Sequence, residues 1–233
     1  MLDWDALSAA ELEEMAEAGR QVLNCYRVLA KSSDNIIGEV IKGHGTFYEM
    51  DHYPPGDIFD PESHSQYYYH SHRGGEHGHF HTFIRSDGML ETIKPIKDQS
   101  HQDFMDERDD DLTHLIGISM DAKGFPLKLF TTNRWVTAEN WYTAEDVISL
   151  IDQFEIDLVP PSWPVNVWMT GFIQLFKPVI KTLILERDET IAAWAEKYPE
   201  RDVFEDRELE ITSAATLDVE AYLQNIQARL PQE

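Results

Sequence analysis

The chain has 233 residues, of which 19 are Lys or Arg and 43 are Asp or Glu, so its formal net charge at pH 7 is −24. This charge argues against DNA, RNA and anionic membranes as partners, because proteins bind such polyanions through Lys and Arg. A hydrophobic content of 42% is typical of a folded protein. We expect one domain over residues 1–233.

The N-terminal part, residues 1–43, is predicted to form two helices. Ser8 and Glu11 have the spacing of a capping box, which begins a helix over residues 9–30. Ser33 is expected to cap a second helix that ends near Gly43. Cys25 is the only cysteine, and the acidic N-terminus lacks the features of a signal peptide, so we expect a cytoplasmic protein without disulfides.

The central part, residues 44–137, is predicted to be the β core. Residues 43–65 are rich in Pro, Gly and Asp and indicate an irregular loop. Residues 66–72 and 77–85 alternate in polarity around Gly74 and Gly75, which predicts a β-hairpin with a two-residue turn. We further expect a short strand at 89–93, an acidic loop or helix at 101–111, and a second hairpin from strands 113–120 and 126–132.

The C-terminal part, residues 143–233, is predicted to be helical. Thr143 begins an amphipathic helix, and further helices are expected over 165–198, with a bend at Pro178, and over 216–230. The apolar side chains of residues 165–185 predict a core helix or a contact surface for a second copy or a partner protein, rather than a membrane segment. Strands in the middle and helices at both ends predict an α+β fold, with a central antiparallel sheet covered by helices.

Five of the ten histidines lie within a stretch of twelve residues in the first hairpin. They are His70, His72, His77, His79 and His81. With Gly74 and Gly75 as the turn, His72 opposes His77, His70 opposes His79, and Tyr68 opposes His81. Directly opposed residues point to the same side of a sheet, so all five imidazoles and Tyr68 are predicted to share one face. A register shift of one residue would separate the histidines of the two strands.

Imidazoles this close together would repel one another if they were protonated, whereas a metal ion binds the neutral base. We therefore predict one divalent transition metal at a partly open site, with Fe or Zn preferred and Mn, Ni or Cu as further candidates. Glu76, Asp57 and Asp60 are the candidate carboxylates. The alternative is a ladder of surface histidines that hydrogen-bond to water and to nearby carboxylates.

Three resemblances accompany this hairpin. His70-Ser71-His72 followed by Glu76 resembles the first metal motif of cupins, which implies a double-stranded barrel and non-haem iron chemistry, although no second motif follows. Residues 77–83 (HGHFHTF) resemble the histidine-triad signature, which implies that His79 attacks the α-phosphate of a nucleotide, although Gly78 and Thr82 depart from the apolar pattern. Residues 67–83 as a whole resemble a bacterial domain family of unknown function, which implies no activity.

Other side chains are candidates for substrate binding or for a structural role. Arg134 follows a strand and is expected to anchor a small-molecule substrate, with Arg73 and Arg85 as alternatives; Arg73 could instead pair with Glu76 across the turn. Tyr68 is a candidate for positioning substrate or donating a proton. Cys25 and His114 are expected to be structural residues, although a neighbouring strand could bring His114 to the site.

These features support three functional hypotheses. The first is a metal-dependent enzyme, an oxygenase or a hydrolase, that acts on a small molecule with Glu76 as ligand or general base. The second is a non-catalytic metal-binding or sensing protein, which would have closed coordination. The third is a metal-free nucleotide hydrolase, which would need His79 exposed beside a phosphate-sized pocket.

Overall fold

The computed structural model describes residues 2–96 and 111–230. Its centre is a six-stranded antiparallel sheet in which the strands follow one another in sequence order. The strands are β1 (Tyr53–Phe59), β2 (Ser65–His70), β3 (Gly78–Arg85), β4 (Leu112–Met120), β5 (Pro126–Thr132) and β6 (Ile211–Thr216). This arrangement confirms the predicted α+β class and the strand pairing of both predicted hairpins. A single sheet of sequential neighbours differs from the double-stranded barrel that the cupin resemblance implies.

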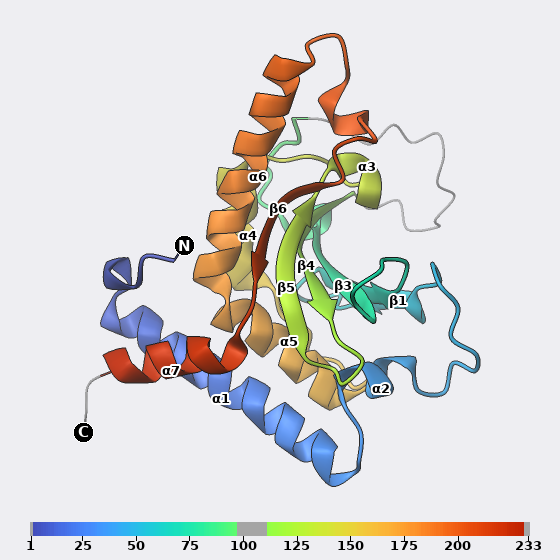
Figure 1. Cartoon of the computed structure of the whole chain (residues 1–233), viewed down its shortest axis with the longest axis vertical. Coiled ribbons are helices and arrows are strands. Elements are labelled where there is room, and N and C mark those ends of the chain that lie inside the picture. The colour runs from blue at the N-terminus through green and yellow to red at the C-terminus, as the bar shows by residue number, and fades with distance from the viewer. Residues whose placement is uncertain (1, 97–110, 231–233) are drawn as a thin grey trace.

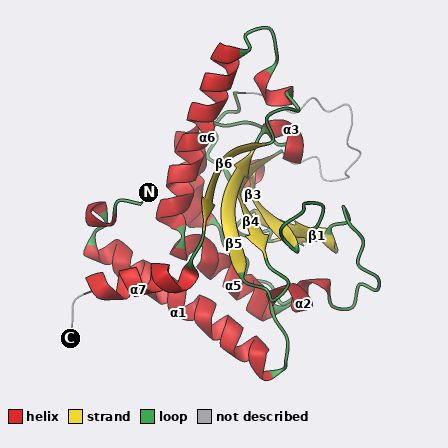
Figure 2. Ribbon diagram, in the orientation of Figure 1, coloured by secondary structure: helices red, strands yellow, loops and turns green. Residues whose placement is uncertain are grey.

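The helices surround this sheet. They are α1 (Ala9–Lys31), α2 (Ile36–Ile41), α3 (Arg134–Thr137), α4 (Ala144–Leu150), α5 (Trp163–Leu175), α6 (Lys177–Lys197) and α7 (Val219–Arg229). Figure 1 shows α6 running beside β6, while α1 and α7 cross near the lower end of the sheet. Figure 2 shows the same orientation with the helices in red and the curved sheet in yellow. Ser8 and Glu11 form the predicted capping box of α1, and Thr143 caps α4 as predicted.

One face of the sheet is the face of the hydrophobic core. Tyr67, Tyr69 and Phe80 point into it and are fully buried, together with Trp168 and Phe172 of α5. The Tyr67 hydroxyl donates to Asn166 Oδ1 over 2.7 Å, which satisfies a polar group inside the core. Because side chains alternate along a strand, Tyr68, His70, His79 and His81 lie on the other face.

The apolar stretch 165–185 is a core element. Its large side chains, among them Trp168, Phe172 and Leu183, are buried, and α5 packs against α1. The predicted bend near Pro178 is a break between α5 and α6 at Phe176. Within residues 2–96 and 111–230, every helix is too short or too polar to span a bilayer. An interface role for this stretch stays a prediction.

Several local predictions are wrong. Residues 53–59 form strand β1 and not a loop, because an edge strand tolerates Pro54 and Pro55, which lie where the β1–β2 register shifts between Tyr53 and Ile58. Strand β6 lies within residues 143–233, which are predicted to be helical, so that prediction is wrong for Ile211–Thr216. Residues 89–93 are a turn with local backbone bonds and not a strand.

Helix boundaries differ as well. Asn35, and not Ser33, caps α2. Helix α7 begins at Val219 after the cap Asp218, because β6 continues to Thr216. The acidic segment expected at 101–111 lies almost wholly outside the described residues.

Candidate metal centre

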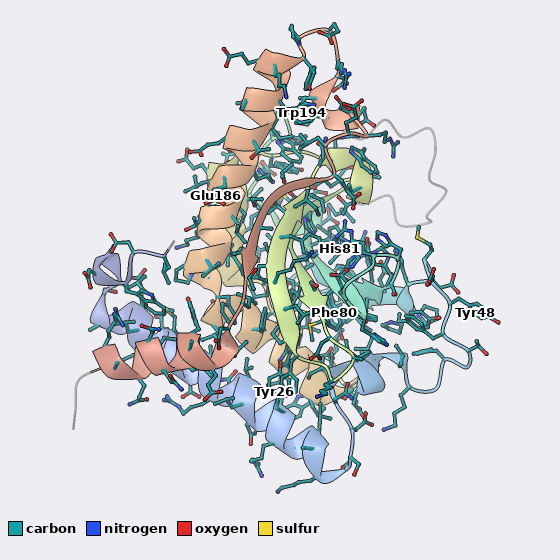
Figure 3. The ribbon with its side chains drawn as sticks, in the orientation of Figure 1. Tyr26, Tyr48, Phe80, His81, Glu186 and Trp194 are labelled. Atoms are coloured by element: carbon teal, nitrogen blue, oxygen red, sulfur yellow. The ribbon has the colours of Figure 1, made fainter. Side chains whose placement is uncertain are left out.

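The site is built on the β2–β3 hairpin, and its strand register is as predicted. His70 opposes His79, and Tyr68 opposes His81. The two strands therefore direct these imidazoles to one side of the sheet. His81 and its neighbour Phe80, both labelled in Figure 3, mark this part of β3.

Three histidines lie close enough together to hold a metal ion. His70, His72 and His79 each offer a nitrogen atom, and these atoms lie within 4.8 Å of one another. His70 Nε2 and His79 Nε2 are 2.7 Å apart. His79 is 0% exposed and His70 is 8% exposed, whereas His72 is exposed to solvent. We call these three residues the His triad. Two of its members are buried, and the third, His72, leaves the cluster open to solvent.

Glu76 holds one member of the triad in place. His79 Nδ1 donates to Glu76 Oε1 over 2.5 Å, and the second carboxylate oxygen accepts a hydrogen bond from the Ser119 hydroxyl. A proton on Nδ1 leaves the lone pair of a neutral imidazole on Nε2, so the lone pair of His79 faces His70. Histidines that bind metals are commonly oriented by a carboxylate in this way.

Phe130 of β5 lies beside the triad. Its ring centre is 5.5 Å from that of His79 and 5.8 Å from that of His81. The ring reaches this position across β4 because residue 117 is a glycine. A Cβ atom at position 117 would lie 2.4 Å from the Phe130 ring.

His77 does not join the triad, so the prediction of five imidazoles on one face is wrong for this residue. Residues 71–77 form a loop and not a two-residue turn, so strand alternation does not extend to His77. Its Nδ1 instead hydrogen-bonds with the Tyr69 hydroxyl over 2.6 Å, and its ring lies near Phe47.

His81 forms a second pair with His114 next to the triad. His81 Nδ1 lies 2.9 Å from His114 Nε2, and the His81 ring centre lies 4.9 Å from that of His79. His114 reaches this face because the β3–β4 register shifts between Thr82 and Phe83. In the part of the chain that the structure describes, His81 Nε2 is buried without a hydrogen-bond partner.

The environment keeps these imidazoles neutral. Burial, followed by the charges of neighbouring histidines, lowers the pKa of His70 to about 2. Burial and the positive charge of Arg187 lower the pKa of His114 to about 3. Burial also lowers the pKa of His79 and His81, although the Glu76 hydrogen bond acts in the opposite direction on His79. Neutral imidazole is the form that binds a metal ion.

The Glu76 carboxyl is ionised beside them. Burial raises its pKa, but hydrogen bonds from His79 and Ser119 act more strongly together, so the pKa lies below its ordinary value. A negative charge next to His79 favours a bound cation.

A family model of a domain of unknown function (DUF6969) matches residues 16–217, which include the whole hairpin and Glu76. The chain belongs to the DUF6969 family. Comparison with curated proteins and comparison with solved structures gave no match. The predicted resemblance to a domain family without a known function is therefore confirmed, and the chemistry of this DUF6969 chain has to be inferred from its own residues.

The other predicted carboxylates have structural partners in this DUF6969 chain. Asp57 accepts hydrogen bonds from His52 Nδ1 over 3.0 Å and from Gln66 Nε2 over 2.7 Å. Asp60 is buried and accepts from the backbone N–H groups of Glu62 and Asp157. Glu76 is thus the predicted carboxylate that the structure brings to the triad, and it contacts His79 instead of completing the ligand set.

Tyr68 lies at the edge of the triad. Its ring stacks on His52, with centres 3.7 Å apart, and lies 5.2 Å from the His70 ring. Burial raises the pKa of its phenol, so Tyr68 stays protonated near neutral pH. A substrate contact for Tyr68 stays a prediction.

The predicted arginines occupy different places. Arg134 forms an ion pair with Glu205, and its role as substrate anchor stays a prediction. Arg85 donates to Gln66 over 2.7 Å and lies over the Phe59 ring. Arg73 pairs with Glu210, so the suggested ion pair between Arg73 and Glu76 is wrong.

Two polar residues near the site are not predicted from the sequence. Ser119 directly opposes His79 on β4, a position that follows only from the inter-strand register. Glu139 is 1% exposed and accepts hydrogen bonds from the His114 backbone and the Thr113 hydroxyl. Burial raises its pKa to about 7. Glu139 follows a short helix, where nothing in the local pattern distinguishes it from a surface acid.

The burial of His79 also bears on the nucleotide-hydrolase hypothesis. That chemistry needs an exposed imidazole, but His79 is 0% exposed and both of its nitrogens have partners. The third hypothesis therefore lacks its nucleophile.

Proposed function

We propose that the His triad binds one divalent transition metal ion and that this centre catalyses a reaction on a small molecule. The observation that carries the proposal is the hydrogen bond from His79 to Glu76, which directs the Nε2 lone pair of His79 toward His70. A surface ladder of histidines would not need a buried carboxylate to fix one tautomer. Metal sites use this arrangement, and loss of such a carboxylate typically weakens metal affinity about 10- to 100-fold.

The spacing of the closest pair of donors, His70 and His79, favours iron over zinc. Metal–nitrogen bonds are about 2.0–2.1 Å long. Two nitrogens 2.7 Å apart would therefore subtend an angle of about 80° at a shared ion. This angle is closer to the right angle of octahedral coordination than to the tetrahedral angle of zinc. Imidazole suits Fe(II), which we take as the first candidate, with Mn(II) as the second.

Three protein ligands leave positions for water, dioxygen or substrate, and such an ion can polarise a substrate or activate water or dioxygen. His72 is exposed, so substrate would enter on that side. Both oxygens of Glu76 have partners, which suits an orienting role better than that of a mobile base. Tyr68, next to His70, is the candidate for a substrate contact.

The alternative is a metal-binding or sensing protein without catalysis. It is favoured by the position of His81, whose buried Nε2 lacks a partner among the described residues and whose ring lies 4.9 Å from that of His79. A small shift that made His81 a fourth ligand would close the coordination sphere.

Metal content and the number of open positions test both forms of the proposal. Protein purified without a histidine tag should contain about one transition metal ion per chain after anaerobic reconstitution with Fe(II). Less than a tenth of that amount with Fe(II), Mn(II) and Zn(II) alike would overturn the proposal. Nitric oxide, a ligand of open Fe(II) sites, should give an electron paramagnetic resonance signal if a position is open. Stoichiometric iron without this signal would favour the non-catalytic alternative.

A further inference from the structure

Arg73 places a guanidinium group beside the His triad. It follows His72 in the chain, and its guanidinium carbon lies 4.8 Å from the centre of the Phe130 ring. The same ring lies 5.5 Å from the ring of His79. Arg73 is therefore next to one triad residue in sequence and shares an aromatic neighbour with another.

The hydrogen bonds of Arg73 leave one side of the guanidinium without an acceptor. Nε and Nη2 both donate to Glu210 Oε1, whereas Nη1 is buried and has no partner among the residues that the structure describes. A buried N–H group without an acceptor is unfavourable, and more so when it carries charge. Glu76 does not satisfy it, because its oxygens accept from His79 and Ser119.

The charges beside the triad are close to balance, although the net charge of the chain is −24. Arg73 and Lys128 lie over the Phe130 ring, Glu76 contacts His79, Glu210 pairs with Arg73, and the triad itself is neutral. The positive charge of Arg73 contributes to the lowered pKa of His70, His72 and His79. A divalent cation at the triad would make this region more positive.

We propose that Arg73 Nη1 binds a carboxylate group of the substrate, so that the centre acts on a small organic acid. This inference rests on the proposed function. The planar guanidinium matches a carboxylate group, and an acceptor at Nη1 would satisfy the unpartnered donor. The substrate would place its acid group at Arg73 and its reacting end toward the triad. Arg73 is thus the specificity residue, in place of the Arg134 predicted from the sequence.

Glycolate is a suitable probe, and imidazole is its neutral control. Both are titrated into the Co(II)-loaded protein, and binding is followed by the visible absorption of cobalt. The substitution Arg73→Lys keeps the charge but removes the planar fork, so we expect it to weaken glycolate binding about tenfold or more. Imidazole, which needs only an open metal position, should bind with unchanged affinity.

Glu210→Gln is the matched variant, because it removes the partner of Arg73 and keeps the guanidinium. If Arg73 binds the acid group, this variant should bind glycolate as tightly as the unmodified protein or more tightly. If Arg73 only tethers its loop to Glu210, both variants should weaken both ligands equally, which would overturn the inference. Should Arg73→Lys fail to fold, tighter glycolate binding by Glu210→Gln with unchanged imidazole affinity would support the inference, and weaker glycolate binding would overturn it.

Three further outcomes distinguish failure of the proposed function from failure of this inference. Failure of the unmodified protein to bind Co(II) would overturn the proposed function and this inference with it. Stoichiometric Co(II) with glycolate affinity unchanged by Arg73→Lys would overturn the inference alone. Inorganic phosphate binding more tightly than glycolate would overturn the assignment of a carboxylate.

Discussion

His70 Nε2 and His79 Nε2 lie 2.7 Å apart, although nine residues of chain separate them. The antiparallel register brings them together, because the two residues are directly opposed on β2 and β3. Two nitrogen lone pairs do not face each other at this distance without a positive centre between them. The pair is therefore either a hydrogen bond between neutral imidazoles or part of a metal site.

We expect His70→Ala and His79→Ala each to reduce bound iron to less than about a tenth of one ion per chain, because each removes a buried ligand. His77→Ala is the matched control. It removes a histidine of the same hairpin, but one that bonds to Tyr69 on the core side, so the iron content should stay near one. Elemental analysis after gel filtration measures all three. Loss of iron in the His77 variant as well would contradict the placement of the site.

Glu76→Ala should weaken metal binding about 10- to 100-fold without abolishing it, because Glu76 orients His79 and does not itself bind the ion. Glu76→Gln, which keeps an acceptor for His79 Nδ1, should have a smaller effect. Competition with a chelator of known affinity gives the dissociation constants. Complete loss of metal in both variants, as severe as in His79→Ala, would instead make Glu76 a direct ligand.

The strands of the β2–β3 hairpin could be predicted from the sequence. The alternation of side chains and the centre of the turn together determine which residues of the two strands are opposed. The same reasoning failed at His77, since the chain leaves strand geometry after His70 and re-enters it only at Gly78. His72 nevertheless joins the triad from this loop, which is a matter of loop conformation and not of strand alternation.

The remaining parts of the site depend on contacts between distant segments. Ser119 reaches Glu76 across the β3–β4 pairing, and Glu210 meets Arg73 from the residue before β6. Strand β6 itself, with the sequence ITSAAT, is recognisable mainly by its pairing with β5. Local patterns carry no information about such pairings, so the sequence alone does not distinguish Arg73 from Arg134 as a substrate anchor.

Gly117→Ala should lower the free energy of unfolding by about 1–3 kcal/mol, the usual cost of overpacking a core. Its added Cβ would lie 2.4 Å from the Phe130 ring, which also lies beside His79 and His81. Gly74→Ala is the matched control, because a Cβ at that position meets nothing within 4 Å. Urea unfolding compares the two. Equal stability of both variants would show that the Phe130 ring does not require a glycine at position 117 for its packing.

The metal-free protein should become less stable below neutral pH. Burial lowers the pKa of four histidines, His70, His79, His81 and His114, whereas the unfolded chain titrates at about 6.5. Below pH 6.5 these histidines bind protons mainly in the unfolded chain, so acid favours unfolding. Glu139 acts in the opposite direction, because its pKa is raised to about 7 and its protonated form is favoured in the folded chain.

His70, His81 and His114, whose pKa values lie well below 6.5, are opposed by Glu139 and leave a net uptake of about two protons on unfolding near pH 5.5. The free energy of unfolding should therefore fall by about 3 kcal/mol per pH unit between pH 6 and 5. Urea unfolding at several pH values in the presence of EDTA measures this slope. His114→Gln removes one of these histidines and should make the slope shallower by about 1 kcal/mol per pH unit. A stability that is flat from pH 7 to 5 would show that the histidines are not held neutral by burial.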